Sequence, residues 1–268
     1  MKSKRELQGF VFDAFSLRKP VSPLLENAVK ARGCFFIERE TKRVLPWKVL
    51  DTAPVPGGRK ELRLKQRGKE FVIMLDKQEL MSSYLSVTEK ALATFGCEAI
   101  KTREKPRVLI GGLGMGYTLQ ATLKVLGDKA EVLVAELVPA VVKWARGPLA
   151  HITDGSLDDP RVAVHEIDVG ELIRGRKSAY DAILLDVDNG PDGLTRSAND
   201  ALYDTAGLAA AHQALRKGGV LAVWSSTPDA KFTARLKKAG FAVKEFPLRA
   251  NGPHGGAKHF IWTATKAG

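Results

Sequence analysis

The chain has 268 residues, 44% of them hydrophobic, which is enough to bury the core of one sizeable α/β domain with a smaller unit attached. It contains no apolar run of membrane-spanning length and no signal-peptide pattern, so we expect a cytoplasmic protein with no membrane partner. Its two cysteines, Cys34 and Cys97, are too few for a disulfide framework and lack metal-ligand spacing.

The net charge of +12 is concentrated in the N-terminal part. Residues 1–106 hold 22 basic and 13 acidic residues, whereas residues 107–268 hold 20 and 17. Such an excess is compatible with a nucleic-acid partner. However, the basic run Arg59–Glu70 alternates charged with apolar residues and has no interleaved aromatic residues. This pattern favours the solvated face of an antiparallel sheet over a nucleic-acid surface.

Short strands are predicted between Gly33 and Asp76. They are GCFFIERE, RVLPWKVL, ELRLKQ and EFVIMLD, the last two joined at an Arg67-Gly68 turn. Asp51–Gly58 is interpreted as a loop because of its proline and glycine content. A helix is expected over Glu79–Phe95, where apolar residues have helical spacing, with Gly96 as its stop. These elements predict an N-terminal segment and a small antiparallel β domain in residues 1–80.

From Arg107 onward, apolar strands alternate with amphipathic helices. The expected strands are RVLI, EVLVAE, VAVHEID, YDAILLD and GVLAVWS, with helices from about Tyr117, over VPAVVKWAR, near Glu171 and from Ala206 to Arg216. This rhythm indicates a buried parallel sheet with right-handed crossovers. FAVKEFPL and KHFIWTAT are separated by a loop too short for a crossover, so they should pair antiparallel. Residues 81–268 therefore predict a Rossmann-like class I methyltransferase fold, with a mostly parallel seven-stranded sheet closed by an antiparallel C-terminal hairpin.

A glycine-rich turn, GGLGMG, lies between the first of these strands and its helix. Glycine allows a tight turn and close approach of the backbone to a ligand, and the following helix presents unpaired N–H groups. The alternative to a ligand-binding role is a tight strand-to-helix turn that binds nothing. We interpret the turn as a nucleotide cradle formed by Gly111, Gly112, Gly114 and Gly116.

Acidic residues end the next two strands. Glu136 lies where a carboxylate can accept hydrogen bonds from both ribose hydroxyls, and Asp168 lies where one can accept from an adenine amino group. Each acid alone could instead be a surface residue or a helix cap. Together with the glycine turn they mark the carboxyl edge of the sheet, where open α/β sheets bind ligands.

The fourth strand leads into an acidic loop, DVDNGPDG, with Asp186, Asp188 and Asp192. One alternative is a solvated loop with no ligand. At the mouth of the cradle, however, these acids could hold a sulfonium or a protonated amine.

The histidines lack metal-ligand spacing, so no metal site is expected. Trp224 is expected in the core or at an interface.

On these motifs the sequence resembles the spermidine synthase family, the polyamine aminopropyltransferases, and especially its spermidine-synthase-like branch. The resemblance covers about residues 33–265 and rests on FVIMLDKQELMSS, SVTEKAL, VLIGGLGMGYTL, VAELVPAVVKWARGPLA, LDDPRVAVHEIDV, YDAILLDVDNGPDGLT and GGVLAVWS. It implies a small N-terminal β domain, a methyltransferase-like catalytic domain and a homodimer. The implied donor is S-adenosylmethionine or its decarboxylated form.

The resemblance also implies roles for individual residues. Glu136, with Leu137, would bind the ribose, and Asp168 with Val169 the adenine. Asp186 would accept the proton of the amine substrate. The expected substrate-binding residues are Asp188, Gln78 and Glu89.

The sequence departs from the family pattern at three places. Gly114 stands where the usual GGGDG loop has its acid, Val87-Thr88-Glu89 replaces a Tyr-His-Glu triplet, and DVDNGPDG replaces a DSSDP-type loop. The leading hypothesis is aminopropyl transfer to a diamine or polyamine, with Asp186 as base. Because the acid is missing at Gly114, an S-adenosylmethionine-dependent methyltransferase acting on a small molecule is the alternative. A nucleic-acid-directed or non-catalytic adapter is a lesser one.

Overall fold

The computed structural model describes residues 45–57, 59–187, 190–191 and 197–268, and residues 45–268 form one compact unit. The predicted strand GCFFIERE and the acids Asp188 and Asp192 lie outside the described residues. Within the described ranges, no helix is long and apolar enough to cross a membrane.

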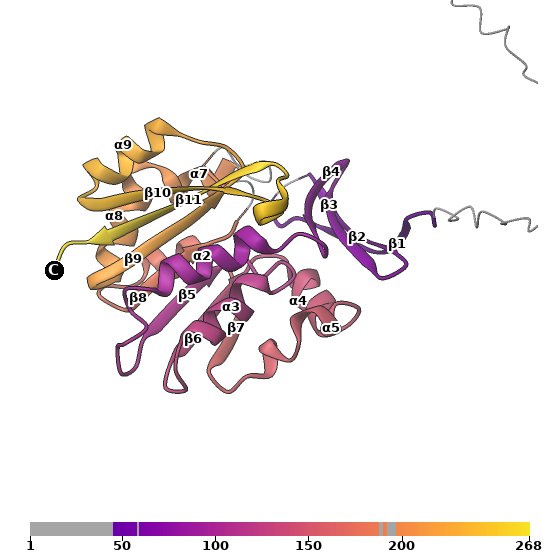
Figure 1. Ribbon diagram of the computed structural model, residues 1–268, viewed down its shortest axis with the longest axis horizontal. Coiled ribbons are helices and arrows are strands. Elements are labelled where there is room, and N and C mark those ends of the chain that lie inside the picture. Colours follow the sequence, from indigo (N-terminus) through magenta and orange to yellow (C-terminus); the bar gives the residue numbers. More distant parts are fainter. Residues whose placement is uncertain (1–44, 58, 188–189, 192–196) are drawn as a thin grey trace, which may run out of the picture. The chain divides into compact units, whose positions relative to one another are not determined.

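A four-stranded antiparallel meander opens the described chain (Figure 1). Its strand order is β1-β2-β3-β4, formed by β1 (Lys48–Pro54), β2 (Glu61–Arg67), β3 (Glu70–Leu75) and β4 (Gln78–Ser82). Arg67 pairs with Glu70 across a turn in which Gly68 has a φ of +59°, as the Arg67-Gly68 signal predicts. Alternate residues of β2, Leu62 and Leu64, are buried, so one face of this small sheet belongs to the core.

Two predicted boundaries in this region are wrong. Residues 51–54 of the expected loop belong to β1, which is an edge strand and therefore tolerates Pro54. The expected helix over Glu79–Phe95 begins only at Val87, because residues 78–82 pair with β3 as strand β4. Hydrogen bonding to a neighbouring strand has overridden the helical spacing of the apolar residues.

The stop predicted at Gly96 is also wrong. Helix α2 (Val87–Cys97) continues through this glycine. A Cβ at Gly96 would collide with the Leu184 side chain and lie 3.0 Å from the Cβ of Ala222. The glycine therefore lets the helix lie close against the large sheet and does not end it.

The large sheet has seven strands in the order β10-β11-β9-β8-β5-β6-β7. The strands are β5 (Arg107–Gly111), β6 (Glu131–Glu136), β7 (Val162–Glu166), β8 (Tyr180–Leu185), β9 (Leu215–Ser225), β10 (Phe241–Arg249) and β11 (Lys258–Lys266). The first five are mutually parallel, and β11 pairs antiparallel with both β9 and β10. The predicted sheet and its C-terminal hairpin are confirmed.

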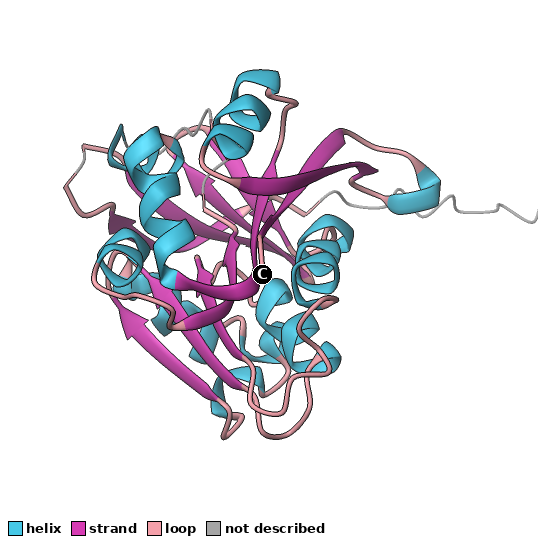
Figure 2. Cartoon of the chain, turned by 90° about the vertical axis from the view of Figure 1, so that its left-hand side faces the viewer, coloured by secondary structure: helices cyan, strands magenta, loops and turns pink. Residues whose placement is uncertain are grey.

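Helices cover both faces of this sheet (Figure 2). Besides α2 they are α3 (Tyr117–Val125), α4 (Pro139–Arg146), α5 (Ala150–Thr153), α6 (Val169–Arg174), α7 (Ser197–Tyr203), α8 (Thr205–Ala214) and α9 (Ala230–Lys238). Successive residues of β8 alternate between two apolar clusters: Leu184 packs with α2 and α3, and Ile183 with α8 and α9. The expected helix Ala206–Arg216 ends at Ala214, since Leu215 already pairs with Tyr180 of β8.

The small sheet shares its core with the large one. Leu64 of β2 and Leu92 of α2 belong to the same buried cluster. A domain boundary between residues 1–80 and 81–268 therefore stays a prediction.

Candidate functional site

A cavity of about 160 Å³ lies at the carboxyl ends of the parallel strands. From this edge of the large sheet and its loops it is lined by Gly112, Gly114, Glu136, Leu137, Asp168, Val169 and Asp186. The small sheet contributes Leu62, Ile73, Leu80 and Met81, with Val55 just after β1. The predicted topology brings most of the predicted nucleotide-binding residues together, because parallel strands end at one edge.

The glycine turn closely approaches the end of β8. Gly112 has a φ of +87°, and a Cβ there would collide with the backbone carbonyl oxygen of Asp186. Its N–H donates to the carbonyl of Ala135 at 2.9 Å, which fixes the turn against β6. Gly111 and Gly116 form the two ends of the turn and are not among the residues that line the cavity.

Glu136 holds the glycine turn from the neighbouring strand. Its Oε2 accepts from the Leu113 N–H at 2.9 Å, and its Oε1 accepts from the Val138 N–H at 2.8 Å. The side chain is buried, and burial raises its pKa, although backbone hydrogen bonds oppose that shift. Glu136 therefore has both a structural role in the turn and a place in the cavity wall.

From the sequence, Asp168 could be a helix cap or an acid that binds the ligand, and its position is compatible with both. It is the N-cap of α6, where its Oδ1 accepts from the Gly170 N–H at 2.7 Å. It also lines the cavity together with Val169.

Two carboxyl groups, those of Asp186 and Glu89, face the same cavity. Asp186 follows β8, and its Oδ2 accepts from the Thr118 hydroxyl at 2.7 Å. Removal from water raises the pKa of Asp186 to about 6. For Glu89, burial and the negative charge of Asp186 raise the pKa to about 7. A cation bound between them would stabilise both ionised forms.

Of the predicted substrate-binding residues, Glu89 lines the cavity. Gln78 is exposed at the start of β4 and does not line the cavity, and Asp188 lies outside the described residues. Trp224 belongs to the buried core, as expected, but it also lines the cavity. In the described part of the chain, no cluster of three His, Cys, Asp or Glu residues is arranged to hold a metal ion.

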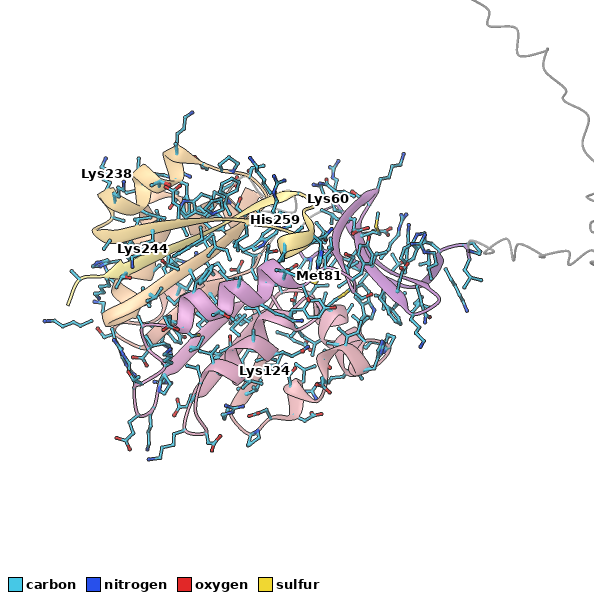
Figure 3. All side chains as sticks on the ribbon, viewed as in Figure 1. Lys60, Met81, Lys124, Lys238, Lys244 and His259 are labelled. Carbon is cyan, nitrogen blue, oxygen red and sulfur yellow. The ribbon has the colours of Figure 1, made fainter. Side chains whose placement is uncertain are left out.

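Met81 is a cavity residue that the sequence did not indicate, because its segment had the spacing of a helix. Gly114 has a φ of +52°, and a Cβ there would lie 2.8 Å from the Met81 sulfur and 2.9 Å from its methyl carbon. The Met115 N–H donates to that sulfur at 3.1 Å, which orients it over the turn. The thioether (Figure 3) thus occupies the space that a side chain at position 114 would need.

Gly114→Ala is expected to lower the free energy of unfolding by about 2–3 kcal/mol, because the new methyl group overlaps Met81 and the backbone has positive φ. In a Met81→Ala background only the backbone cost of about 1 kcal/mol should remain. Urea unfolding of the single and double variants measures this coupling. Gly127→Ala is the control, since a Cβ there meets nothing within 4 Å. If Gly114→Ala lowers the free energy of unfolding equally in both backgrounds, Met81 does not fill the space above Gly114.

Glu89→Gln is expected to make stability less dependent on pH. The pKa of Glu89 is raised from 4.5 to about 7, so its stabilising contribution is complete below about 4.5 and is lost as the pH rises through 7. Relative to the unmodified protein, the variant should therefore gain stability between pH 5 and pH 8. Urea unfolding at both pH values tests this, with the exposed Glu104→Gln as control. An equal difference at the two pH values would refute it.

Solved structures share this architecture. The chain is similar to a spermidine synthase in complex with the transition-state analogue AdoDATO, with a TM-score of 0.64 and 21% identity over 82% of this chain and 73% of that one. For the spermidine synthase of Thermotoga maritima the TM-score is 0.65, with the same identity and coverage. This chain has the spermidine synthase fold. The predicted fold class is confirmed.

Sequence comparison agrees with this fold. A polyamine aminopropyltransferase of Mycobacterium tuberculosis is 32% identical over 148 residues, which are 52% of this chain and 27% of that protein. The chain spans about a quarter of the length of this curated relative. No protein-family model matches the chain. The predicted resemblance to spermidine synthases is confirmed by these relatives.

Proposed function

We propose that this chain is a transferase that moves an aminopropyl group from decarboxylated S-adenosylmethionine to an amine of a diamine or polyamine. The observation that carries the proposal is the acidic lining of the cavity. Four carboxyl groups line it, those of Glu89, Glu136, Asp168 and Asp186, and no Lys, Arg or His side chain of the described residues does. Such a cavity favours cationic ligands, as both the donor and the acceptor are. The curated relatives are named polyamine aminopropyltransferases.

The glycine turn supports the decarboxylated donor. The Leu113 N–H donates to Glu136, the Met115 N–H to the Met81 sulfur and the Gly116 N–H to the Leu113 carbonyl. The backbone amide of Gly114 also lowers the pKa of Glu136. A donor carboxylate would thus find no cation among the described lining residues, and the N–H groups of Gly112, Leu113, Met115 and Gly116 already have acceptors within the protein. This weighs against the methyltransferase alternative, although Gly114 itself favours it.

In the proposed reaction, an amine nitrogen attacks the carbon beside the sulfonium. The C–N bond forms, the C–S bond breaks, and its electron pair stays on sulfur. The amine must lose a proton, which costs about 4 kcal/mol at neutral pH for an amine of pKa near 10. Asp186 accepts this proton, and Thr118 holds its carboxylate in place. Holding amine and sulfonium in line contributes more, on the order of 7 kcal/mol.

Glu136 and Asp168 position the donor in this proposal. Glu136, beside Leu137, would accept from the ribose hydroxyls, and Asp168 with Val169 would contact the adenine. Glu89 would share the amine with Asp186. The roles of Gln78 and Asp188 and the homodimer stay predictions.

Titration calorimetry with decarboxylated S-adenosylmethionine, S-adenosylmethionine and methylthioadenosine tests the proposal. The decarboxylated donor should bind at least about tenfold more tightly than the carboxylated one, a difference of about 1.4 kcal/mol. Mass spectrometry with 1,4-diaminobutane should then detect the aminopropyl product. Preference for S-adenosylmethionine together with a methylated product would establish the alternative. RNA binding with a steep salt dependence and no transfer would favour an adapter.

A further inference from the structure

A chain of hydrogen bonds leads away from the carboxyl pair. The Thr88 hydroxyl donates to Glu89 Oε2 at 3.1 Å and lies 2.9 Å from Nδ1 of His259. Thr88 is buried, whereas His259 is only half-buried. The chain therefore runs from a cavity carboxyl group to a partly exposed imidazole.

His259 is held in this position from several sides. It belongs to β11, 171 residues from Thr88 along the sequence (Figure 3). The ring of Trp224, a cavity residue, meets the imidazole edge-on at 4.7 Å between centroids. Burial lowers the pKa of His259, so the ring is neutral at pH 7 and has a free electron pair for a proton.

A threonine hydroxyl both donates and accepts, so the chain has two polarities. When Glu89 is ionised, His259 donates through Nδ1–H to Thr88, and Thr88 donates to Glu89. When Glu89 is protonated, it donates to Thr88, and Thr88 donates to Nδ1. Passing from the second arrangement to the first moves one proton from the carboxyl group to the imidazole.

We propose that Glu89, Thr88 and His259 form a proton path that carries the proton of the acceptor amine out of the cavity. This inference rests on the proposed function. The amine proton is accepted by Asp186 and shared with Glu89. Glu89 then passes a proton to the Thr88 oxygen while the Thr88 proton moves to Nδ1, and the imidazolium releases its Nε2 proton to water. One proton leaves, nothing is oxidised or reduced, and the imidazole tautomers re-equilibrate with water.

Other titratable groups around Glu89 are few in the described structure. They are Asp186 beyond β8, Tyr117 of α3 and Lys90 of its own helix. The Lys90 ammonium lies 5.2 Å above the ring of Tyr117. Thr88 is the group that joins the Glu89 carboxyl to an imidazole by hydrogen bonds. In this path His259 acts through Thr88 and Glu89, and is therefore a positioning and relay residue.

Steady-state kinetics with decarboxylated S-adenosylmethionine and 1,4-diaminobutane between pH 6 and pH 9 test the path. Thr88→Val and His259→Ala should each lower kcat about 10- to 100-fold, with KM changed less than about twofold. Free imidazole should restore kcat of His259→Ala but not of Thr88→Val. The exposed Thr94→Val, on the same helix, and His254→Gln, in the loop before β11, should match the unmodified protein. An unchanged kcat in either variant, or a loss in His259→Ala that imidazole does not relieve, would overturn the proposal.

A second measurement does not depend on turnover. Nuclear magnetic resonance of the full chain labelled with ¹⁵N-histidine follows the tautomer and pKa of each imidazole. Both Thr88→Val and Glu89→Gln should change the tautomer ratio and pKa of His259 and leave those of His254 unchanged. If the unmodified protein shows no transfer, the proposed function fails and this measurement alone decides the hydrogen-bonded chain. If neither substitution changes the tautomer ratio or the pKa of His259, the hydrogen-bonded chain is refuted, whether or not the protein catalyses transfer.

Discussion

Asp186→Asn should lower kcat about 10²- to 10⁴-fold, the range of a general base in an enzyme. The asparagine oxygen can still accept from the Thr118 hydroxyl, which bonds Asp186 at 2.7 Å, so the loop should keep its geometry. What is lost is the carboxylate that accepts the amine proton. Affinity for methylthioadenosine should therefore change little.

Single-turnover kinetics and calorimetry separate these two effects. In the unmodified protein, kcat should fall as the pH drops through about 6, where the Asp186 carboxylate takes up a proton. Asp128→Asn, an exposed change of the same chemistry, is the matched control. Normal turnover by Asp186→Asn would remove its role as base.

Glu136→Gln should weaken methylthioadenosine binding about 10- to 100-fold, as expected for losing charge-assisted hydrogen bonds worth about 1.5–3 kcal/mol. The Glu136 carboxylate faces two backbone donors, the N–H groups of Leu113 and Val138. A glutamine must turn its NH₂ group toward one of them, which loosens the glycine turn and removes a ribose acceptor.

Calorimetry with methylthioadenosine measures that loss, and thermal unfolding checks that the variant is folded. Glu131→Gln is the control, because Glu131 is exposed at the other end of the same strand. Undiminished affinity would show that Glu136 serves only to hold the turn.

Most of the large sheet could be predicted because the pattern of apolar residues reflects which positions are buried. Apolar runs such as EVLVAE are buried on both faces in a parallel sheet, and the helices between them show one apolar side. The errors lie where pairing partners decide the structure. Residues 78–82 have the spacing of a helix, but hydrogen bonds from β3 make them a strand.

The meeting of several cavity residues at one edge of the sheet was predictable for the same reason. Once the strands are known to be parallel, the ends of β5, β6 and β8 must meet at one edge, and with them Gly112, Glu136 and Asp186. That inference needs only the direction of the strands and no knowledge of how the side chains pack. The juxtaposition of these three residues therefore follows from local pattern and topology alone.

The rest of the site depends on contacts between distant segments. Met81 fills the space above Gly114, and His259 reaches Thr88 across 171 residues. Neither residue has a local signal, because a thioether in a strand and a histidine in a hairpin are ordinary at those positions. Residue periodicity specifies which face of an element is buried and in what order strands follow. Which side chains fill one particular cavity is set by packing, since it depends on the relative placement of several elements at once.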